Sequence, residues 1–296
     1  MYEIVKNYRD NEKLRKSFNE LAEKTFGLSF EDWYQNGFWR EHYIPYSMTE
    51  DGKVLANVSV NRMDMNWNGK KYSLIQLGTV MTAEEHRNRG LIRRLMEEIE
   101  KDYEGQWDGM YLFANDSVLD FYPRFGFRPE REFQYYKEVR HSADTQDQQK
   151  RDAWAKQIPM KTKEQWASLE TAIKNSRPHS AFEMWENRGL YLFYVSKFMQ
   201  ENVYYIEKLD TYVIGELEEG DLFLHDYFSE REITLEQVAE AFGDSVKKVT
   251  LGFTPLDPTG FERQVLREED TTLFVKGEVF EKFRDETLMF QTLSHA

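Results

Sequence analysis

The stretch EEHRNRGLIRRLMEEIEKDYE (residues 84–104) carries its charges in an unusual order. Apolar residues recur at helical spacing from Leu91 to Tyr103, which predicts an amphipathic helix that begins near Gly90. A helix start carries partial positive charge and usually attracts acidic side chains, whereas basic side chains favour the helix end. Here arginines crowd the start and acidic residues fill the end. The order predicts that a negative charge from outside the helix compensates these arginines.

The order of elements around this stretch favours a bound anion. A predicted strand, a short turn that contains Gly90, and the helix follow one another. Glycine lets the backbone turn and lets a ligand approach closely. The first N–H groups of a helix have no partner within the helix, so together with arginine side chains they suit a phosphate or pyrophosphate. The alternative is a solvated helix whose arginines pair with Glu84 and Glu85.

Two sequence motifs identify the class of phosphate ligand. The chain has neither GxxxxGK[ST] nor GxGxxG, which argues against a P-loop and a dinucleotide fingerprint. The stretch instead resembles the acyl-CoA-binding signature Q/R-x-x-G-x-G/A of the GNAT superfamily of N-acyltransferases. In this chain it reads Arg87-Asn88-Arg89-Gly90-Leu91-Ile92. Asn115 and the run FYPRFGF (residues 121–127) resemble the next signature of that superfamily.

The resemblance implies transfer of an acetyl group from acetyl-CoA, as co-substrate, to an amine. It implies that backbone groups of Val80, Met81 and Thr82 hold the pantetheine arm, and that Asn115 steadies it. One N–H of this strand would stabilise the negative charge that develops on the thioester oxygen. Tyr122 would be the general acid that protonates the leaving thiolate. The pyrophosphate would bind at Arg87, Asn88, Arg89, Gly90, Leu91 and Ile92.

The sequence does not identify the general base. Some members of the superfamily use a Glu near the start of the preceding strand, where this chain has Gln76. His86 stands before the first signature arginine, and a histidine titrates near neutral pH. His42, Glu41, Asp64 and a water relay stay open.

The element pattern predicts an α/β protein with a mixed sheet. Strand and helix patterns alternate, and Asn68-Gly69 joins two strands as a hairpin turn. We expect a catalytic GNAT domain in residues 1–141, a polar linker in residues 142–157 and a second, degenerate GNAT-like domain in residues 158–296. The layout is similar to the enhanced-intracellular-survival type of acetyltransferase, without its third domain.

The second domain is predicted from a repeated pattern. FEDWYQNG (residues 30–37) is echoed by FEMWENRG (residues 182–189), which would make Trp33 and Trp185 core anchors of equivalent helices. The helix TLEQVAEAF falls where the arginine-rich helix falls in the first half. Its Thr234 and Gln237 form the pattern of a capping box, which closes a helix start with the chain's own atoms. We therefore expect only the first half to bind acetyl-CoA.

The composition of the chain argues against several kinds of site and partner. The chain of 296 residues has no Cys, 53 acidic and 39 basic residues, and a net charge of −14. These features argue against disulfides and thiolate metal sites, and we expect no metal cofactor and no nucleic-acid partner. No apolar run reaches the length of a membrane span, so we expect no membrane partner and a cytoplasmic location.

The acidic surface would attract a cationic acceptor amine, either a small molecule or a peptide. The sequence leaves the oligomeric state open, and a homo-oligomer is compatible with it. A non-enzymatic alternative is a catalytically silent module that binds acyl-CoA in a regulatory or structural role. Retention of Tyr122 favours the enzyme, and Gln76 in place of a Glu favours the silent module.

Overall fold

The structure is a computed structural model that describes residues 1–139 and 152–295. The first half contains β1 (Glu3–Lys6), α1 (Glu12–Phe26), α2 (Glu31–Gln35), β2 (Tyr43–Glu50), β3 (Lys53–Trp67), β4 (Lys70–Thr82), α3 (Leu91–Asp102), β5 (Gly109–Ala114), β6 (Arg128–Pro129) and β7 (Phe133–Glu138). The second half contains β8 (Lys156–Gln157), α4 (Lys163–Asn175), β9 (Phe182–Trp185), α5 (Arg188–Phe198), β10 (Val203–Ile206), β11 (Thr211–Glu218), β12 (Asp221–Phe228), α6 (Leu235–Ala241), β13 (Lys248–Leu251), β14 (Glu262–Val265), β15 (Thr272–Lys276) and α7 (Glu281–Asp285). Of the expected linker, residues 142–151 lie outside the described residues.

Local sequence chemistry explains the main boundaries in the first half. The Asn11 side chain accepts a hydrogen bond from the Leu14 N–H at 3.2 Å and so caps the start of α1. Gly27 ends the same helix with φ of 67°, a left-handed conformation that glycine adopts without strain. Asn68 and Gly69, with φ of 49° and 82°, make the predicted hairpin turn between β3 and β4.

The second half repeats the order of elements of the first half. Helices α4 and α5 precede the strands β10, β11 and β12, as α1 and α2 precede β2, β3 and β4. In both halves the next helix, α3 or α6, leads to a strand that runs parallel to the one before it. Both halves are therefore built as mixed sheets of the predicted α/β class.

The echoed motif does not mark equivalent helices. Trp33 lies in helix α2 and is buried, which agrees with its expected place in the core. Trp185 instead ends strand β9, which pairs antiparallel with the outer part of β3 from Trp67 to Asp64. The expectation of equivalent helices is therefore wrong at Trp185. The long β3 hairpin offers this segment an open edge, and the pairing outweighs its local resemblance to α2.

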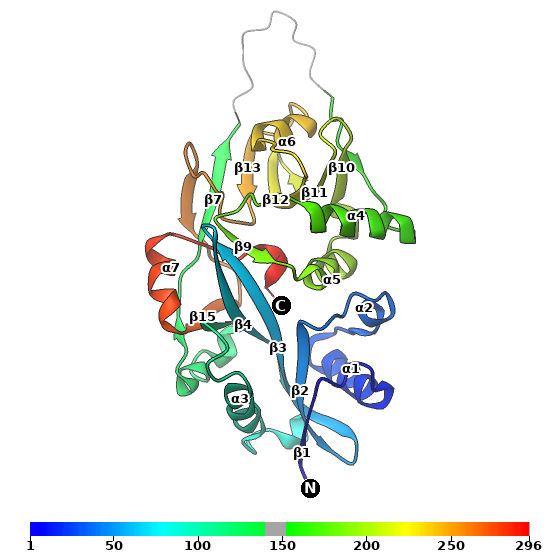
Figure 1. The fold of residues 1–296 in the computed structure, drawn as a ribbon, viewed down its shortest axis with the longest axis vertical. Coiled ribbons are helices and arrows are strands. Elements are labelled where there is room, and N and C mark those ends of the chain that lie inside the picture. Colours follow the sequence, from blue (N-terminus) through cyan, green and yellow to red (C-terminus); the bar gives the residue numbers. More distant parts are fainter. Residues whose placement is uncertain (140–151, 296) are drawn as a thin grey trace, which may run out of the picture.

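The two sheets exchange strands. The first sheet has the order β1-β2-β3-β4-β5-β15-β6, with β9 added on β3, and the second has the order β14-β7-β13-β12-β11-β10-β8. Strand β15 comes from the second half, yet it pairs antiparallel with β5 of the first half. Strand β7 runs the other way and pairs with β13 of the second half. Figure 1 shows β7 crossing from the lower half to the upper one.

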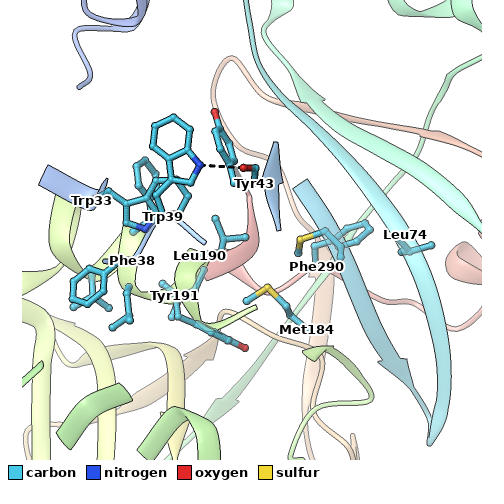
Figure 2. Close-up of a cluster of buried hydrophobic side chains, with 14 of the residues drawn as sticks. Trp33, Phe38, Trp39, Tyr43, Leu74, Met184, Leu190, Tyr191 and Phe290 are labelled. Carbon is cyan, nitrogen blue, oxygen red and sulfur yellow. Dashed lines mark hydrogen bonds between the residues drawn. The ribbon is translucent and has the colours of Figure 1, made fainter. Parts of the chain in front are cut away.

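A large hydrophobic core joins the two halves. It gathers apolar side chains of α1 and α2 from the first half and of α4 and α5 from the second. Figure 2 shows part of it, where Trp33, Trp39 and Tyr43 meet Leu190 and Tyr191. Trp33 donates a hydrogen bond across the interface to the Gly189 carbonyl at 2.8 Å. Two further cores lie under α3 and α6, on the outer faces of the sheets.

No helix among the described residues is both long enough and apolar enough to cross a membrane.

Candidate active site

Strand β4 carries a bulge at the predicted cofactor-binding residues. Met81 pairs with Asn57 and Gly78 with Ser59, so two residues of β4 face a single residue of β3. Thr79, in the bulge, has φ of 49°, which is a strained conformation for a β-branched residue. Such strain costs on the order of 1–3 kcal/mol and persists where the surroundings hold it.

A buried chain of hydrogen bonds holds the bulge in place. The Tyr8 hydroxyl lies 2.6 Å from Ser47 Oγ, which donates to Asn57 Oδ1 at 2.8 Å. Asn57 Nδ2 in turn donates to the Thr79 carbonyl at 2.9 Å. The Thr79 hydroxyl lies 2.5 Å from the hydroxyl of Tyr43. These contacts compensate the backbone strain and fix the direction in which β4 continues.

Beyond Gln76, which precedes the bulge, β4 and β5 separate. Their parallel pairing covers only three positions and ends with Gln76 opposite Tyr111. Strand β4 nevertheless continues to Thr82 and β5 to Ala114. Within the described part of the chain, no backbone hydrogen bond joins the two continuing segments. Their facing edges thus present N–H and C=O groups to a guest that can lie between the strands.

Val80, Met81 and Thr82 form the wall of this opening on β4. The Val80 side chain packs toward the core under α3, and the Met81 side chain packs into the central core on the opposite face. Their backbone groups, rather than their side chains, are therefore the ones directed along the sheet toward the opening.

The start of α3 is left open. Its N-cap is Gly90, with φ of 72°, and no side chain caps the helix. The first turn contains no acidic residue, and Asn88 also has a positive φ, of 60°. Residues 87–90 are exposed, whereas Leu91 is buried and Ile92 packs against the core. Unbonded N–H groups, exposed arginines and a backbone that curls around the helix start fit the pyrophosphate of an acyl-CoA.

The two signature arginines differ in their surroundings. Arg87 is 57% exposed, and its guanidinium lies 3.9 Å from the Glu84 carboxylate, a loose contact. Arg89 donates to the Glu85 carbonyl at 2.8 Å and to the Tyr2 hydroxyl at 2.9 Å. Local pairing therefore accounts for only a small part of the positive charge at this turn.

The acidic end of α3 is compensated by lysines from other elements. Lys6 of β1 binds Glu98 at 3.0 Å and Asp102 at 2.5 Å. Lys276 of the exchanged strand β15 binds Glu100. The inverted charge order of the helix is thus resolved by tertiary contacts at its end, while its start keeps an excess of positive charge.

Tyr122 lies in a short 3₁₀ turn (Tyr122–Phe125) and is 5% exposed. Its ring packs against Phe121, Phe127 and Phe274, and Phe274 belongs to the exchanged strand β15. Burial raises the pKa of the Tyr122 phenol to about 12, so it carries its proton at neutral pH. No described residue is hydrogen-bonded to its hydroxyl, which leaves the proton available to a bound molecule.

Asn115 follows β5 directly and is held by a residue of the second half. Its Nδ2 donates to the Asp270 carboxylate at 2.9 Å, and the same carboxylate accepts the Asp116 N–H at 2.7 Å. This pairing directs the Asn115 N–H group toward Asp270. The amide oxygen accepts no hydrogen bond from the described residues and is the atom free to bind a ligand.

The structure shows where each candidate for the general base lies. Gln76 is buried; its oxygen accepts from Asn61 at 3.3 Å and its Nε2 donates to the Ser294 carbonyl at 2.8 Å. His86 Nδ1 lies 3.0 Å from the Tyr2 hydroxyl, beside the arginine-rich turn. Asp64 accepts a hydrogen bond from Ser73 at the other end of β4.

His42 and Glu41 precede β2. Burial lowers the pKa of His42, and a backbone hydrogen bond lowers that of Glu41. Among the described residues, neither forms a hydrogen bond or ion pair with the separated part of β4 and β5.

Sequence reasoning missed the residues that the second half adds to this site. Asp270 and Phe274 reach it on either side of the start of β15, and Ser294 reaches Gln76 from the segment after α7. The strand pattern TTLFVK is legible in the sequence. Nothing in a single strand pattern, however, says which sheet the strand joins.

The equivalent helix start in the second half is closed. Thr234 caps α6 by accepting the Gln237 N–H at 3.2 Å, and the Gln237 side chain accepts the Thr234 N–H at 2.8 Å. The predicted capping box is confirmed. It satisfies the N–H groups that remain open at the start of α3.

The equivalent opening in the second half is filled. Strand β12 stays paired with β13 only as far as Leu224. Beyond it, the Thr292 N–H donates to the Gly252 carbonyl at 2.8 Å, and Gln291 donates to the Asp226 carboxylate at 2.8 Å. Residues 291–292 thus occupy the place that the first half leaves open.

Among residues 1–139 and 152–295, no group of three or more His, Asp or Glu side chains is arranged to hold a metal ion.

A family model matches part of the chain. Residues 9–129 match the model of the acetyltransferase (GNAT) domain family. No curated protein sequence matches the chain.

Three solved structures share the fold over most of the chain. A probable N-acyltransferase from Enterococcus faecalis V583 has a TM-score of 0.58 and 15% identity, over 93% of this chain and 72% of that one. A GCN5-related N-acetyltransferase from Kribbella flavida has a TM-score of 0.52 and 18% identity, over 93% and 70%. Eis1 from Mycobacterium abscessus has a TM-score of 0.52 and 14% identity, over 92% and 73%. The chain therefore carries a GNAT acetyltransferase domain in residues 9–129, and its tandem GNAT-like layout is similar to that of Eis1.

Proposed function

We propose that this chain is an N-acetyltransferase that moves an acetyl group from acetyl-CoA to the primary amine of a cationic acceptor. The observation that carries the proposal is the combination of a separated β4–β5 pair with an uncapped, arginine-rich start of α3 in the same half. An elongated molecule with a pyrophosphate at one end and an amide-bearing arm at the other fits this combination.

The roles of the residues follow from their places. Residues 87–92 would hold the pyrophosphate through backbone N–H groups and the two arginines. Backbone groups of Val80, Met81 and Thr82, and the free oxygen of Asn115, would hold the arm. When bound, acetyl-CoA supplies an activated acetyl group as a thioester. Tyr122, whose buried phenol keeps its proton, would donate that proton to the leaving sulfur.

We further propose that residues 1–141 form the catalytic domain and that residues 158–296 form a degenerate GNAT-like domain, joined by a linker at residues 142–157. The capped start of α6 and the filled β12–β13 opening support a non-binding role for the second domain. Its exchanged strand β15 supports the first domain.

The acceptor class is supported by charge. A net charge of −14 raises the local concentration of cations near the surface. Steering of this kind is screened within about 10 Å at 0.1 M salt. The turnover of a cationic acceptor per unit concentration should therefore fall as salt rises, whereas the turnover of a neutral acceptor should not.

The test is a panel of amines with acetyl-CoA, followed by release of free thiol. The chain has no Cys, so a thiol reagent detects only the CoA that is released. We expect thiol release that depends on the amine and is fastest with polycations. Binding of acetyl-CoA in calorimetry without amine-dependent release would instead identify a silent binding module. Failure to bind acetyl-CoA would contradict both functions.

A further inference from the structure

The strand exchange places a turn of the second half at the proposed active site. Thr272, at the start of β15, pairs with Ala114 at the end of β5. The turn before it, residues 268–271, is closed by a bridge between Glu268 and Thr271. Asp270 of this turn holds both Asn115 and the N–H of the following residue. The turn is therefore anchored where β5 has separated from β4.

Residues 290–295 approach the same place from the central core. The Phe290 ring stacks on Tyr111 at 3.9 Å, and the Ser294 carbonyl accepts from Gln76 at 2.8 Å. Gln76 and Tyr111 are the last paired residues of β4 and β5. The next residue of the segment, His295, stacks on Phe113 at 4.0 Å. Phe113 belongs to the separated part of β5, so the imidazole covers the face of the opening opposite α3.

Glu268 and His295 face each other without a direct hydrogen bond. Their Oε2 and Nδ1 atoms are 3.8 Å apart. The other ring nitrogen, Nε2, lies 3.4 Å from the Phe290 carbonyl, to which it can only donate. That contact assigns the proton to Nε2 and leaves Nδ1 as an acceptor, like the carboxylate opposite it. Because Glu268 Oε2 and His295 Nδ1 both accept hydrogen bonds, a hydrogen-bond donor can bind between them.

The surroundings of Glu268 and His295 leave both side chains able to accept hydrogen bonds from a cation. The side chains are 37% and 13% exposed, so a small molecule can reach them. Burial lowers the pKa of His295 to about 4, which keeps the ring neutral at pH 7, and burial raises the pKa of Glu268. The nearby titratable groups that interact electrostatically with the pair are His225 of β12, Glu132 before β7 and Tyr194 of α5. No lysine or arginine among the described residues forms an ion pair with Glu268.

We propose that Glu268 and His295, both from the second half, bind the ammonium group of the acceptor. The proposal rests on the function proposed above and names the acceptor site for it.

The proton and bond balance is simple. An acceptor R–NH₃⁺ gives up two protons as it becomes the amide. One leaves to solvent before the attack. The nitrogen then forms a bond to the acetyl carbon, and the bond from that carbon to sulfur breaks. The sulfur ends as a thiol with the proton of Tyr122, and the second amine proton restores the tyrosine through water.

The test compares two amines of similar size that differ in charge. Ethylamine is protonated near pH 7, whereas the fluorines of 2,2,2-trifluoroethylamine keep it neutral. Glu268→Gln and His295→Phe, the latter chosen to keep the stacking on Phe113, should each lower kcat/KM for ethylamine by about 10-fold or more, the loss expected when a hydrogen bond to a charged group is removed. The loss with trifluoroethylamine should be much smaller. Glu269→Gln, the exposed neighbour, is the matched control and should change neither value.

Thermal unfolding and acetyl-CoA affinity, both unchanged, would show that the variants fold and keep the donor site. Variants that acetylate ethylamine as fast as the wild type would overturn the proposal. So would variants in which kcat/KM falls equally for both amines. A wild type that acetylates no amine would contradict the proposed function instead. In that case NMR of the ¹⁵N-labelled His295 imidazole tests the binding site directly. A shift on titration with ethylammonium, absent in Glu268→Gln, supports the pair, and no shift overturns it.

Discussion

At the scale of single residues, Tyr122 shows how the fold prepares a weak acid for a specific task. Its phenol is buried among Phe121, Phe127 and Phe274, and this burial raises its pKa to about 12. A neutral phenol is stabilised over the phenolate in such a place. The side chain thus keeps its proton at neutral pH, as the general acid that we propose must do.

Replacing Tyr122 by Phe should lower kcat by about 10²–10⁴-fold, because a positioned general acid contributes an effect of that size. Acetyl-CoA affinity and the melting temperature should stay close to the wild-type values, since the ring packing is kept. With the folded pKa near 12, the wild-type rate should also show no alkaline fall assignable to Tyr122 below about pH 10. A Phe variant with wild-type kcat in steady-state assays would remove Tyr122 from the chemistry.

At the scale of elements, the two equivalent helices α3 and α6 begin in opposite ways. The start of α3 is a glycine with no side-chain cap, next to exposed arginines. The start of α6 is closed by the Thr234–Gln237 capping box. Because an uncapped helix start is a fixed donor site for anions, this contrast supports our proposal that only the first half binds phosphate.

Replacing Arg87 and Arg89 together by Ala should weaken acetyl-CoA binding by about 2–4 kcal/mol, the size of two charge-assisted contacts. Folding should change little, because Arg87 is more than half exposed and Arg89 binds only at the surface. Arg231→Ala, next to the start of α6, is the matched control and should leave the affinity unchanged. Unchanged affinity of the double variant in calorimetry would show that this turn does not bind the pyrophosphate.

At the scale of the whole molecule, the strand exchange makes the halves depend on each other. Strand β7 of the first half completes the second sheet, and β15 of the second half completes the first. The core between them is shared, with Trp33 bonded to the backbone of Gly189. Neither half can bury its own apolar surface alone.

Residues 1–139 and residues 152–296, expressed separately, should each fail to unfold cooperatively. Co-expressed, they should purify together and bind acetyl-CoA, because the exchanged strands can still pair. Circular dichroism melts and calorimetry of the pieces and of the complex provide the measurement. Cooperative melting of residues 1–139 alone, with the acetyl-CoA affinity of the full chain, would contradict this mutual dependence.

The sequence predicted local features well and long-range placement poorly. The Asn68-Gly69 turn, the helix after Gly90 and the Thr234 capping box follow from chemistry within a few residues, and all three are present. The pairing of β15 with β5 depends on contacts between distant segments, which a single strand pattern does not encode. The contacts of Asp270 with Asn115 and of His295 with Phe113 were missed for the same reason. Trp185 was misplaced because the open edge of β3 outweighs a local resemblance to α2.

The most direct test of the central claim is a crystal structure of the chain with acetyl-CoA. We expect one molecule per chain, with its pyrophosphate at residues 87–92, its arm between β4 and β5 and its thioester near Tyr122. A chain without acetyl-CoA at residues 87–92, or with a second molecule at Thr234, would contradict the account.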